Sequence, residues 1–349
     1  MRRLKRQLRL IGGYAKDSAS QKWFLARHPP RAPLWDRSQT LEQRIPDAIE
    51  RGSSYLLNQQ SMDGSVRGFL LVPGASTSWL TAHVSLVTEH VPYLDAFRER
   101  AADFLEHCGP DDGGWGYNRR VGVDIDSSVQ AHMVLLNQER SVPTFVYEWI
   151  LASQHAEGGF PTYAPLGPGG SAEHGWQQPH LDVSIVVCEW LRRYNLAPSR
   201  RSLLVDWIHS QTANASVPSY WWNGQQYGLW ALARASLLDE RFTSAITDPL
   251  DLSHEAPDLP MALTAALSVG ANRGLVAAKL DHLLSLQLDD GSWPCARCLR
   301  VTDSKVHSPD SDTGGRRYAD KRRVFSTAHA IAALQVVQSD IHRPLLIDE

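Results

Sequence analysis

Two carboxylates, Asp124 and Asp126, directly precede an apolar stretch with helical spacing in the segment GGWGYNRRVGVDIDSSVQAHMVLL. A buried carboxyl group beside a second carboxylate holds its proton more tightly, because burial disfavours the anion and like charges repel. Such a group can act as a general acid near neutral pH. Asp and Ser before an apolar helix are also ordinary N-cap residues. The pattern therefore predicts an acid at Asp126, a helix cap, or both.

Other segments place chemically useful side chains at the position that corresponds to Asp126. Aligning DVSIVVCEWL with DSSVQAHMVLL puts Asp182 on Asp126, and aligning WLTAHV and FSTAHA puts Trp79 and Phe325 there. Helix starts that converge on one cavity would bring these side chains together. We therefore predict that Asp182, Trp79 and Phe325 bind the substrate, with Ser127 beside them.

Aromatic residues are concentrated in SYWWNGQQYGLW, which contains Trp222 and Tyr227. With helical spacing, such residues either pack in the core or line a cavity wall. An aromatic face attracts a cation through the ring quadrupole and does not trap it as a nucleophile would. We predict that Trp222 and Tyr227 line a substrate cavity.

These segments belong to internal repeats, in which a Gln is followed after three residues by a Gly and then by a bulky apolar side chain. QSMDGSV, QHAEGGF and QLDDGSW fit this pattern, and PDDGGW keeps the glycine and the aromatic residue. The glycines Gly64, Gly113, Gly158 and Gly291 are spaced by 49, 45 and 133 residues. Since 133 is close to three times 45, two degenerate repeats are expected between the last pair.

Each repeat begins with an amphipathic helical pattern and ends in a more uniformly apolar one, which favours an outer and an inner ring of helices. Six such pairs predict an all-α fold, an (α/α)6 toroid of about twelve helices in two concentric rings with few or no long strands. We assign residues 1–40 to a basic, partly flexible N-terminal segment, 41–340 to a single toroid and 341–349 to a C-terminal tail. Residues 161–179 and 302–323 lack periodicity and are predicted to be long loops.

The repeats and the segment around Asp126 resemble those of the squalene and hopene cyclases, the class II terpene cyclases. Their acid motif is Asp-x-Asp-Asp-Thr, with the middle Asp as the proton donor; this sequence has Asp124-Ile125-Asp126-Ser127-Ser128, with Ser127 in the third position. The resemblance implies a single-domain terpene cyclase. It would cyclise a linear isoprenoid or a prenylated (meroterpenoid) substrate by acid initiation, with Asp126 as the catalytic proton donor and Asp124 as its neighbour.

Two other functions stay open. The serine at position 127 favours a toroid that binds an isoprenoid or a protein without catalysis. Protein prenyltransferase β subunits use the same toroid with zinc, and the pair Cys295 and Cys298, with Asp303 or His307, would have to hold that metal. A lone Cys-x-x-Cys is weak evidence for zinc, so we predict no metal and no cofactor.

Composition excludes some classes of partner. The 35 basic and 38 acidic residues give a formal net charge of -3, which provides no electrostatic footprint for nucleic acid. No apolar run reaches the roughly 18 residues of a membrane span. The first eleven residues carry five basic side chains between leucines, which is typical of a solvated end or of a segment that rests on anionic lipid. We expect a cytoplasmic protein with a small-molecule isoprenoid partner, with or without peripheral membrane contact through this N-terminus.

Overall fold

The computed structural model describes residues 40–109, 113–164, 174–252, 256–271, 273–307 and 315–341. The basic N-terminal segment and the C-terminal tail predicted above lie outside these ranges, apart from residue 40 and residue 341. Helices of two kinds alternate along the described chain. The first kind is α2 (Leu41–Gln59), α4 (Asp95–Cys108), α6 (Thr144–Ala152), α8 (Pro198–Gln211), α10 (Thr243–Leu252) and α12 (Arg273–Ser285). The second kind is α3 (Ser78–Val87), α5 (Ile125–Asn137), α7 (Leu181–Arg193), α9 (Gln226–Arg234), α11 (Asp258–Ser268) and α13 (Val324–Ile341).

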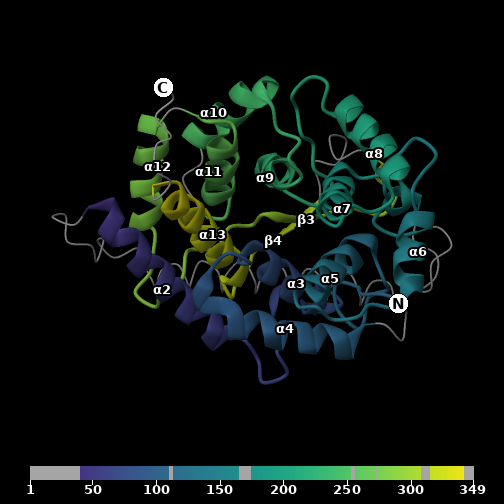
Figure 1. Cartoon of the computed structure of the whole chain (residues 1–349), viewed down its shortest axis with the longest axis horizontal. Coiled ribbons are helices and arrows are strands. Elements are labelled where there is room, and N and C mark those ends of the chain that lie inside the picture. The colour runs from purple at the N-terminus through teal and green to yellow at the C-terminus, as the bar shows by residue number, and fades with distance from the viewer. Residues whose placement is uncertain are drawn as a thin grey trace, which may run out of the picture.

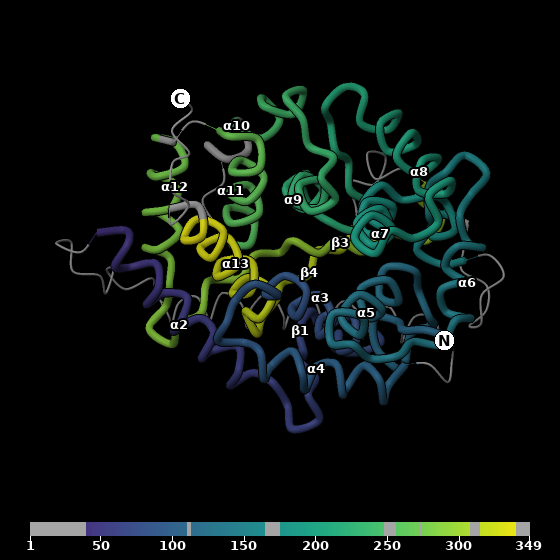
Figure 2. The backbone as a smooth tube through the Cα atoms, in the orientation of Figure 1, coloured from purple at the N-terminus to yellow at the C-terminus, as the bar shows by residue number. Residues whose placement is uncertain are grey.

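The second set forms a closed inner ring. Each of its helices contacts the next one in the order α3, α5, α7, α9, α11 and α13, and α13 returns to α3. The first set packs outside this ring, and Figures 1 and 2 show the helices arranged around a common centre. The predicted all-α toroid of about twelve helices in two rings is therefore confirmed.

Burial explains why the two sets differ in sequence. Every residue of α3 is buried, and so are ten of the thirteen residues of α5, because inner helices are covered on all sides. The outer helix α2 instead buries one stripe that includes Ile45, Ile49 and Leu56. Although the inner helices are apolar, no helix in the described ranges is long and apolar enough to cross a membrane.

Two short antiparallel hairpins accompany the helices. Strands β1 (Gly68–Leu71) and β2 (Gly74–Ser76) form one, and β3 (Leu299–Val301) and β4 (Arg316–Tyr318) form the other, which lies across the centre of the ring in Figure 1. The prediction of a long loop over residues 302–323 is wrong at β4, which pairs with β3. The strand sequence Arg-Arg-Tyr carries no apolar alternation, and its pairing with β3 comes from main-chain hydrogen bonds that leave no pattern in the sequence.

The glutamines of the repeats connect neighbouring outer helices. The amide Nε2 of Gln287 donates to the carbonyl of Gly291 in its own turn, at 2.9 Å, and to the carbonyl of Ala48 in α2, also at 2.9 Å. Gln60 and Gln154 make the same pair of bonds, to α4 and α8 respectively. One side chain thus fixes a turn and the helix beside it.

The repeat glycines allow each turn to pack directly against the main chain of the neighbouring outer helix. Gly291 has a φ of +84°, and a Cβ on it would lie 2.4 Å from the carbonyl oxygen of Arg51 in α2. Gly64 repeats this geometry, with a φ of +86° and a Cβ position 2.0 Å from the carbonyl oxygen of Arg100 in α4. Only a residue without a side chain fits these turns.

Each turn is also tied to the inner helix that follows it. A main-chain N–H in the turn donates to a hydroxyl near the start of that helix. The pairs are Val66 with Thr81, Trp115 with Ser128, Phe160 with Ser184, and Trp293 with Thr327. These four hydroxyl residues thus occupy equivalent positions in their repeats, which agrees with the alignment of Asp182, Trp79 and Phe325 with Asp126 two residues earlier.

The glutamine connection predicts a stability effect. Gln287→Ala should lower the free energy of unfolding by about 1–3 kcal/mol, because it leaves two carbonyls without their donor. Gln211→Ala is a matched control, since Gln211 is exposed at the end of α8. Urea unfolding of both variants measures the difference, and equal midpoints would contradict the connecting role of Gln287.

Candidate active site

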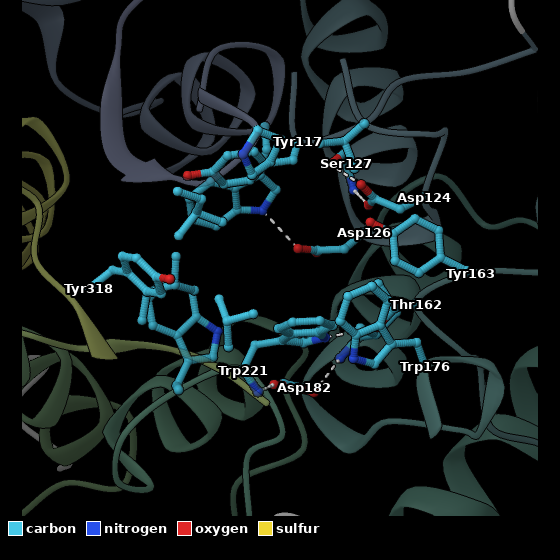
Figure 3. A pocket seen from close by; sticks show the side chains of 18 of the residues that line it. Tyr117, Asp124, Asp126, Ser127, Thr162, Tyr163, Trp176, Asp182, Trp221 and Tyr318 are labelled. Carbon is cyan, nitrogen blue, oxygen red and sulfur yellow. Dashed lines mark hydrogen bonds between the residues drawn. The ribbon is translucent and has the colours of Figure 1, made fainter. Parts of the chain in front are cut away.

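A cavity of about 340 Å³ lies where the first residues of α3, α5 and α7 meet the two hairpins. Figure 3 shows the side chains that converge on it. Eight aromatic residues line it: Trp79, Tyr117, Tyr163, Trp176, Trp221, Trp222, Tyr227 and Tyr318. Three carboxyl groups also line it, those of Asp124, Asp126 and Asp182. The cavity therefore combines an apolar, π-rich wall with acidic groups.

Asp124, and not Asp126, caps helix α5. Its Oδ1 accepts from the main-chain N–H of Ser127 at 2.7 Å, and its Oδ2 accepts from the Ser127 hydroxyl at 2.8 Å. Both oxygens of Asp124 are thus engaged by the residue that stands in the third position of the motif. This leaves Asp126 free of the capping role that the sequence alone allowed for it.

Asp126 extends into the cavity from the first turn of α5 (Figure 3). Its Oδ2 accepts from the indole Nε1–H of Trp79 at 2.7 Å, and its Oδ1 accepts from the amide Nε2 of Gln130 at 2.8 Å. The two donors come from different helices, since Trp79 lies in the first turn of α3 whereas Gln130 lies one turn further along α5. Both oxygens are held in place, and neither is used to cap the helix.

Burial dominates the electrostatics of the two acids. It raises the pKa of Asp126 from 3.8 to about 6, and the negative charge of Asp182 adds to this, while the hydrogen bonds from Gln130 and Trp79 oppose it. The pKa of Asp124 is raised to about 8; burial is the largest cause, and the charge of Asp126 is the second. Because burial raises both pKa values and the charge of Asp126 opposes ionisation of Asp124, the pair retains a proton at pH values where an exposed aspartate has lost it.

Asp182 holds one wall of the cavity in place. It lies in the first turn of α7, and its Oδ2 accepts from the Ser219 hydroxyl at 2.7 Å and from the main-chain N–H of Trp221 at 2.9 Å. These bonds fix the loop that carries Trp221 and Trp222. The predicted residue Asp182 therefore lines the cavity and also fixes part of its wall.

The predicted aromatic residues occupy two layers. Trp79, Trp222 and Tyr227 line the cavity, and the rings of Trp222 and Tyr227 are stacked with centroids 4.2 Å apart. Phe325 is fully buried one layer behind, stacked on Trp222 at 5.1 Å, and is not among the residues that line the cavity. It supports the wall from the inner helix α13.

Sequence reasoning did not single out several other residues of the cavity. Thr162 lines it and accepts from the indole N–H of Trp221 at 2.8 Å, and its hydroxyl lies 2.7 Å from Nδ1 of His180. Thr162 and Tyr163 follow the third repeat turn, in a stretch without periodicity. The sequence signal available for them was their place four and five residues after the repeat glycine Gly158.

The cysteine pair shows no metal-binding arrangement. Cys298 is buried and Cys295 is partly buried, and burial raises the pKa of the Cys295 thiol to about 12. Among the described residues, no group of three or more His, Cys, Asp and Glu side chains lies close enough together to hold a metal ion. The donor set that a zinc site would need is therefore not assembled around these thiols in that part of the chain.

The role of Asp182 can be tested by paired substitutions. Asp182→Ala should lower the free energy of unfolding by about 1–3 kcal/mol, because the N–H of Trp221 and the hydroxyl of Ser219 lose their acceptor. Asp182→Asn keeps an oxygen that can accept both bonds and should cost less. Chemical unfolding followed by tryptophan fluorescence measures both, and an equal loss in the two variants would contradict this role.

No family model and no curated protein matches the sequence, whereas solved structures do match the fold. The type II terpene cyclase MstE from Scytonema superposes with a TM-score of 0.74 at 19% identity, over 86% of this chain and 99% of that one. An MstE variant in complex with geranylgeranyl dihydroxybenzoate superposes with a TM-score of 0.73 at 20% identity, over the same shares.

A larger enzyme matches over part of its length. The ent-copalyl diphosphate synthase from Streptomyces platensis superposes with a TM-score of 0.52 at 16% identity, over 74% of this chain and 50% of that one. The likeness in each case is one of architecture, and it agrees with the closed inner ring of helices. This protein has a class II terpene cyclase-like fold.

Proposed function

We propose that this protein is an enzyme that cyclises a linear isoprenoid, or an aromatic compound that carries a prenyl chain, by protonating its terminal alkene or epoxide. The neighbouring structures support the substrate class. MstE variants are described in complex with geranylgeranyl dihydroxybenzoate as substrate and with merosterolic acid A as product. The substrate of this chain is taken to be of the same general kind, a small molecule with an isoprenoid tail.

One observation carries the proposal: a carboxyl group with a raised pKa extends into an aromatic cavity. Burial raises the pKa of Asp126 from 3.8 to about 6, and its carboxyl group lies among Trp79, Trp222 and Tyr227. A proton donor must hold its proton at working pH and still release it to a weak base. The aromatic faces then attract the developing positive charge without reacting with it.

The proposed reaction is balanced in atoms and charge. The π electrons of the terminal alkene form a C–H bond with the proton of Asp126, whose O–H bond breaks, so that a carbocation and the Asp126 carboxylate result. Successive alkenes attack the cation and close the rings. A proton is finally lost from carbon to a base, and Asp126 regains a proton from solvent, so the product is an isomer of the substrate.

Asp124 and Ser127 form the surroundings of Asp126 at the start of α5 and influence its acid strength. Because burial raises the pKa of Asp124 to about 8, Asp124 is neutral where Asp126 holds its proton, and it acts there as the buried polar group that caps α5 beside the acid. The two hydrogen bonds from Ser127 favour the charged form of Asp124. A serine supplies no third carboxylate, so we expect a weaker acid than in the hopene cyclases and a preference for epoxides or activated alkenes.

A toroid that binds an isoprenoid without catalysis is the second candidate, and Ser127 in the motif is the observation that favours it. The cavity would then bind the ligand by apolar contact alone. Incubation with a panel of linear isoprenoids, oxidised and unoxidised, followed by mass spectrometry separates the two functions. Binding without any cyclic product would support the second one.

Substitution of the two aspartates tests the assignment of the acid. Asp126→Asn should abolish turnover and change the free energy of unfolding by no more than roughly 1 kcal/mol, because the amide cannot deliver a proton and Asp126 does not cap the helix. Asp124→Asn should reduce the rate less, since Asn can still cap α5. A fully active Asp126→Asn variant would remove Asp126 from the mechanism, and an inactive Asp124→Asn variant beside it would assign the acid to Asp124.

The pKa of Asp126 predicts the pH dependence of the rate. A general acid works in its protonated form, and burial raises the pKa of this group from 3.8 to about 6. The single-turnover rate should therefore be constant below pH 6 and fall about tenfold for each pH unit above it. Rate measurements between pH 5 and pH 9 check this, and a rate that rises with pH over this range would contradict an acid mechanism.

A further inference from the structure

A buried chain of hydrogen bonds extends from Asp126 into the inner ring. Gln130 donates to Asp126 Oδ1, and its Oε1 lies 2.9 Å from Nδ1 of His83 in α3. The Nε2 atom of His83 lies 3.0 Å from Nε2 of His329 in α13. Three inner helices thus contribute to a single line of polar groups behind the proposed acid. Gln130, His83 and His329 are each no more than 2% exposed.

Both imidazoles are held neutral. Burial lowers the pKa of His83 from 6.5 to about 3 and lowers the pKa of His329 well below its usual value. The charge of Arg234 in α9 acts in the same direction on both rings. Aromatic rings cover His83, which stacks with Trp79 at 5.0 Å and with Phe325 at 4.9 Å. A neutral imidazole carries one N–H, so each ring can donate on one side only.

This restriction gives the chain two possible directions. In the forward direction, His329 Nε2–H donates to His83 Nε2, His83 Nδ1–H donates to Gln130 Oε1, and the Gln130 amide donates to Asp126 Oδ1. In the reverse direction, a proton on Asp126 Oδ1 donates to a turned Gln130 amide, and both imidazoles change tautomer. The direction of the chain therefore depends on whether the proton of Asp126 lies between Oδ1 and Gln130 or points away from Gln130.

The surroundings of His329 favour the forward direction. Reversal would place a proton on Nδ1 of His329, and this atom has no hydrogen-bond partner among the residues that the structure describes. An N–H that finds no protein acceptor, in a residue only 2% exposed, loses hydrogen-bonding free energy. In the forward direction Nδ1 holds only a lone pair, so the less unfavourable arrangement keeps Asp126 Oδ1 as an acceptor.

We propose that Gln130, His83 and His329 are positioning residues that hold the Gln130 amide as a donor to Oδ1 of Asp126, so that the acid proton does not point into the buried chain and stays on the cavity side of the carboxyl group. This inference rests on the proposed function for its catalytic consequence. The Oδ2 atom accepts from the indole of Trp79 on the cavity wall, and that indole can only donate. The acid proton therefore occupies a lone pair that neither Gln130 nor Trp79 uses, and it is delivered to a substrate among Trp79, Trp222 and Tyr227.

The residues of this hydrogen-bond chain occupy equivalent positions in their repeats. Gln130, His83 and His329 all lie two residues after the hydroxyl residue that binds a repeat turn, namely Ser128, Thr81 and Thr327. Asp126, Trp79 and Phe325 lie two residues before the same hydroxyls. Since residues four apart lie on one face of a helix, the inner ring presents two layers of side chains, with the polar chain one helical turn behind the acid and the wall.

Charged and titratable groups face this chain from the neighbouring helices. Asp124 of α5, Asp182 of α7 and Tyr227 of α9 lie close enough to Asp126 for their charges to interact with it. Arg234 of α9 faces both imidazoles, and it is itself paired with Glu189 at 2.6 Å and with Glu89 at 3.3 Å. Asp126 is therefore the member of the chain that titrates near neutral pH, since both histidines remain neutral there.

The tautomers can be read directly by nitrogen NMR of the full chain with labelled histidines. From well below to well above pH 6, we expect His83 to remain protonated on Nδ1 and His329 on Nε2. A change of either tautomer as Asp126 gains its proton would overturn the proposal. The measurement needs no turnover, so an inactive protein with fixed tautomers would refute the cyclase function and leave the hydrogen-bond inference standing.

A matched pair of variants tests the catalytic consequence. His329→Phe keeps the ring shape but removes the donor to His83, and kcat should fall by roughly tenfold with little change in KM. His329→Gln places an amide N–H near the position of Nε2 and should retain more of kcat. Equal kcat values in both variants and the wild type would overturn the positioning role, and so would equal losses in both variants.

Gln130→Met removes the donor to Oδ1 and gives a readout that loss of packing would not change. Since this hydrogen bond favours the carboxylate, the pKa that limits the rate should shift upward while kcat falls. The pH dependence of kcat in Gln130→Met and in wild type measures the shift. An unchanged pKa in the pH dependence of kcat would contradict the link between Gln130 and Asp126.

Discussion

The burial of two carboxyl groups at the start of α5 is the constraint on which the site depends. A carboxylate removed from water must be compensated by hydrogen bonds or must keep its proton. Asp124 is compensated by Ser127, and Asp126 by Trp79 and Gln130. Because burial still dominates, both pKa values remain raised. A buried carboxyl group whose pKa is raised in this way is suited to act as a general acid.

The toroid makes this burial possible by repeating one local unit. In the repeats that keep the pattern, a glutamine links the turn to the next outer helix, a glycine permits the close approach, and a hydroxyl ties the turn to the inner helix. The first turns of the inner helices α3, α5, α7 and α9 then line one cavity. The side chain two residues before each hydroxyl lines the cavity or packs behind its wall. The side chain two residues after each hydroxyl lies one helical turn further from the cavity. The units that hold the ring together therefore also position Asp126 and its partners.

The repeats allowed the fold to be predicted, because glycine spacing and the alternation of amphipathic and apolar helices survive in the sequence. The same alignment placed Asp182, Trp79 and Phe325 at helix starts. It could not decide that Asp124 caps α5 whereas Asp126 faces the cavity, since both precede the helix and only the path of the chain separates them. Phe325 lies behind the wall because Trp222, from a degenerate repeat, occupies the space in front of it. The alignment also contained His83, Gln130 and His329 at one position, but their contact depends on ring closure between α13 and α3.

The central claim is that catalysis begins with transfer of a proton to carbon. Incubation of the protein in D₂O with an unoxidised linear isoprenoid, followed by mass spectrometry and NMR of the product, tests it most directly. The account predicts a cyclic product with one deuterium on carbon at the chain terminus, and no such product from Asp126→Asn. A cyclic product without deuterium on carbon would contradict initiation by protonation of the alkene.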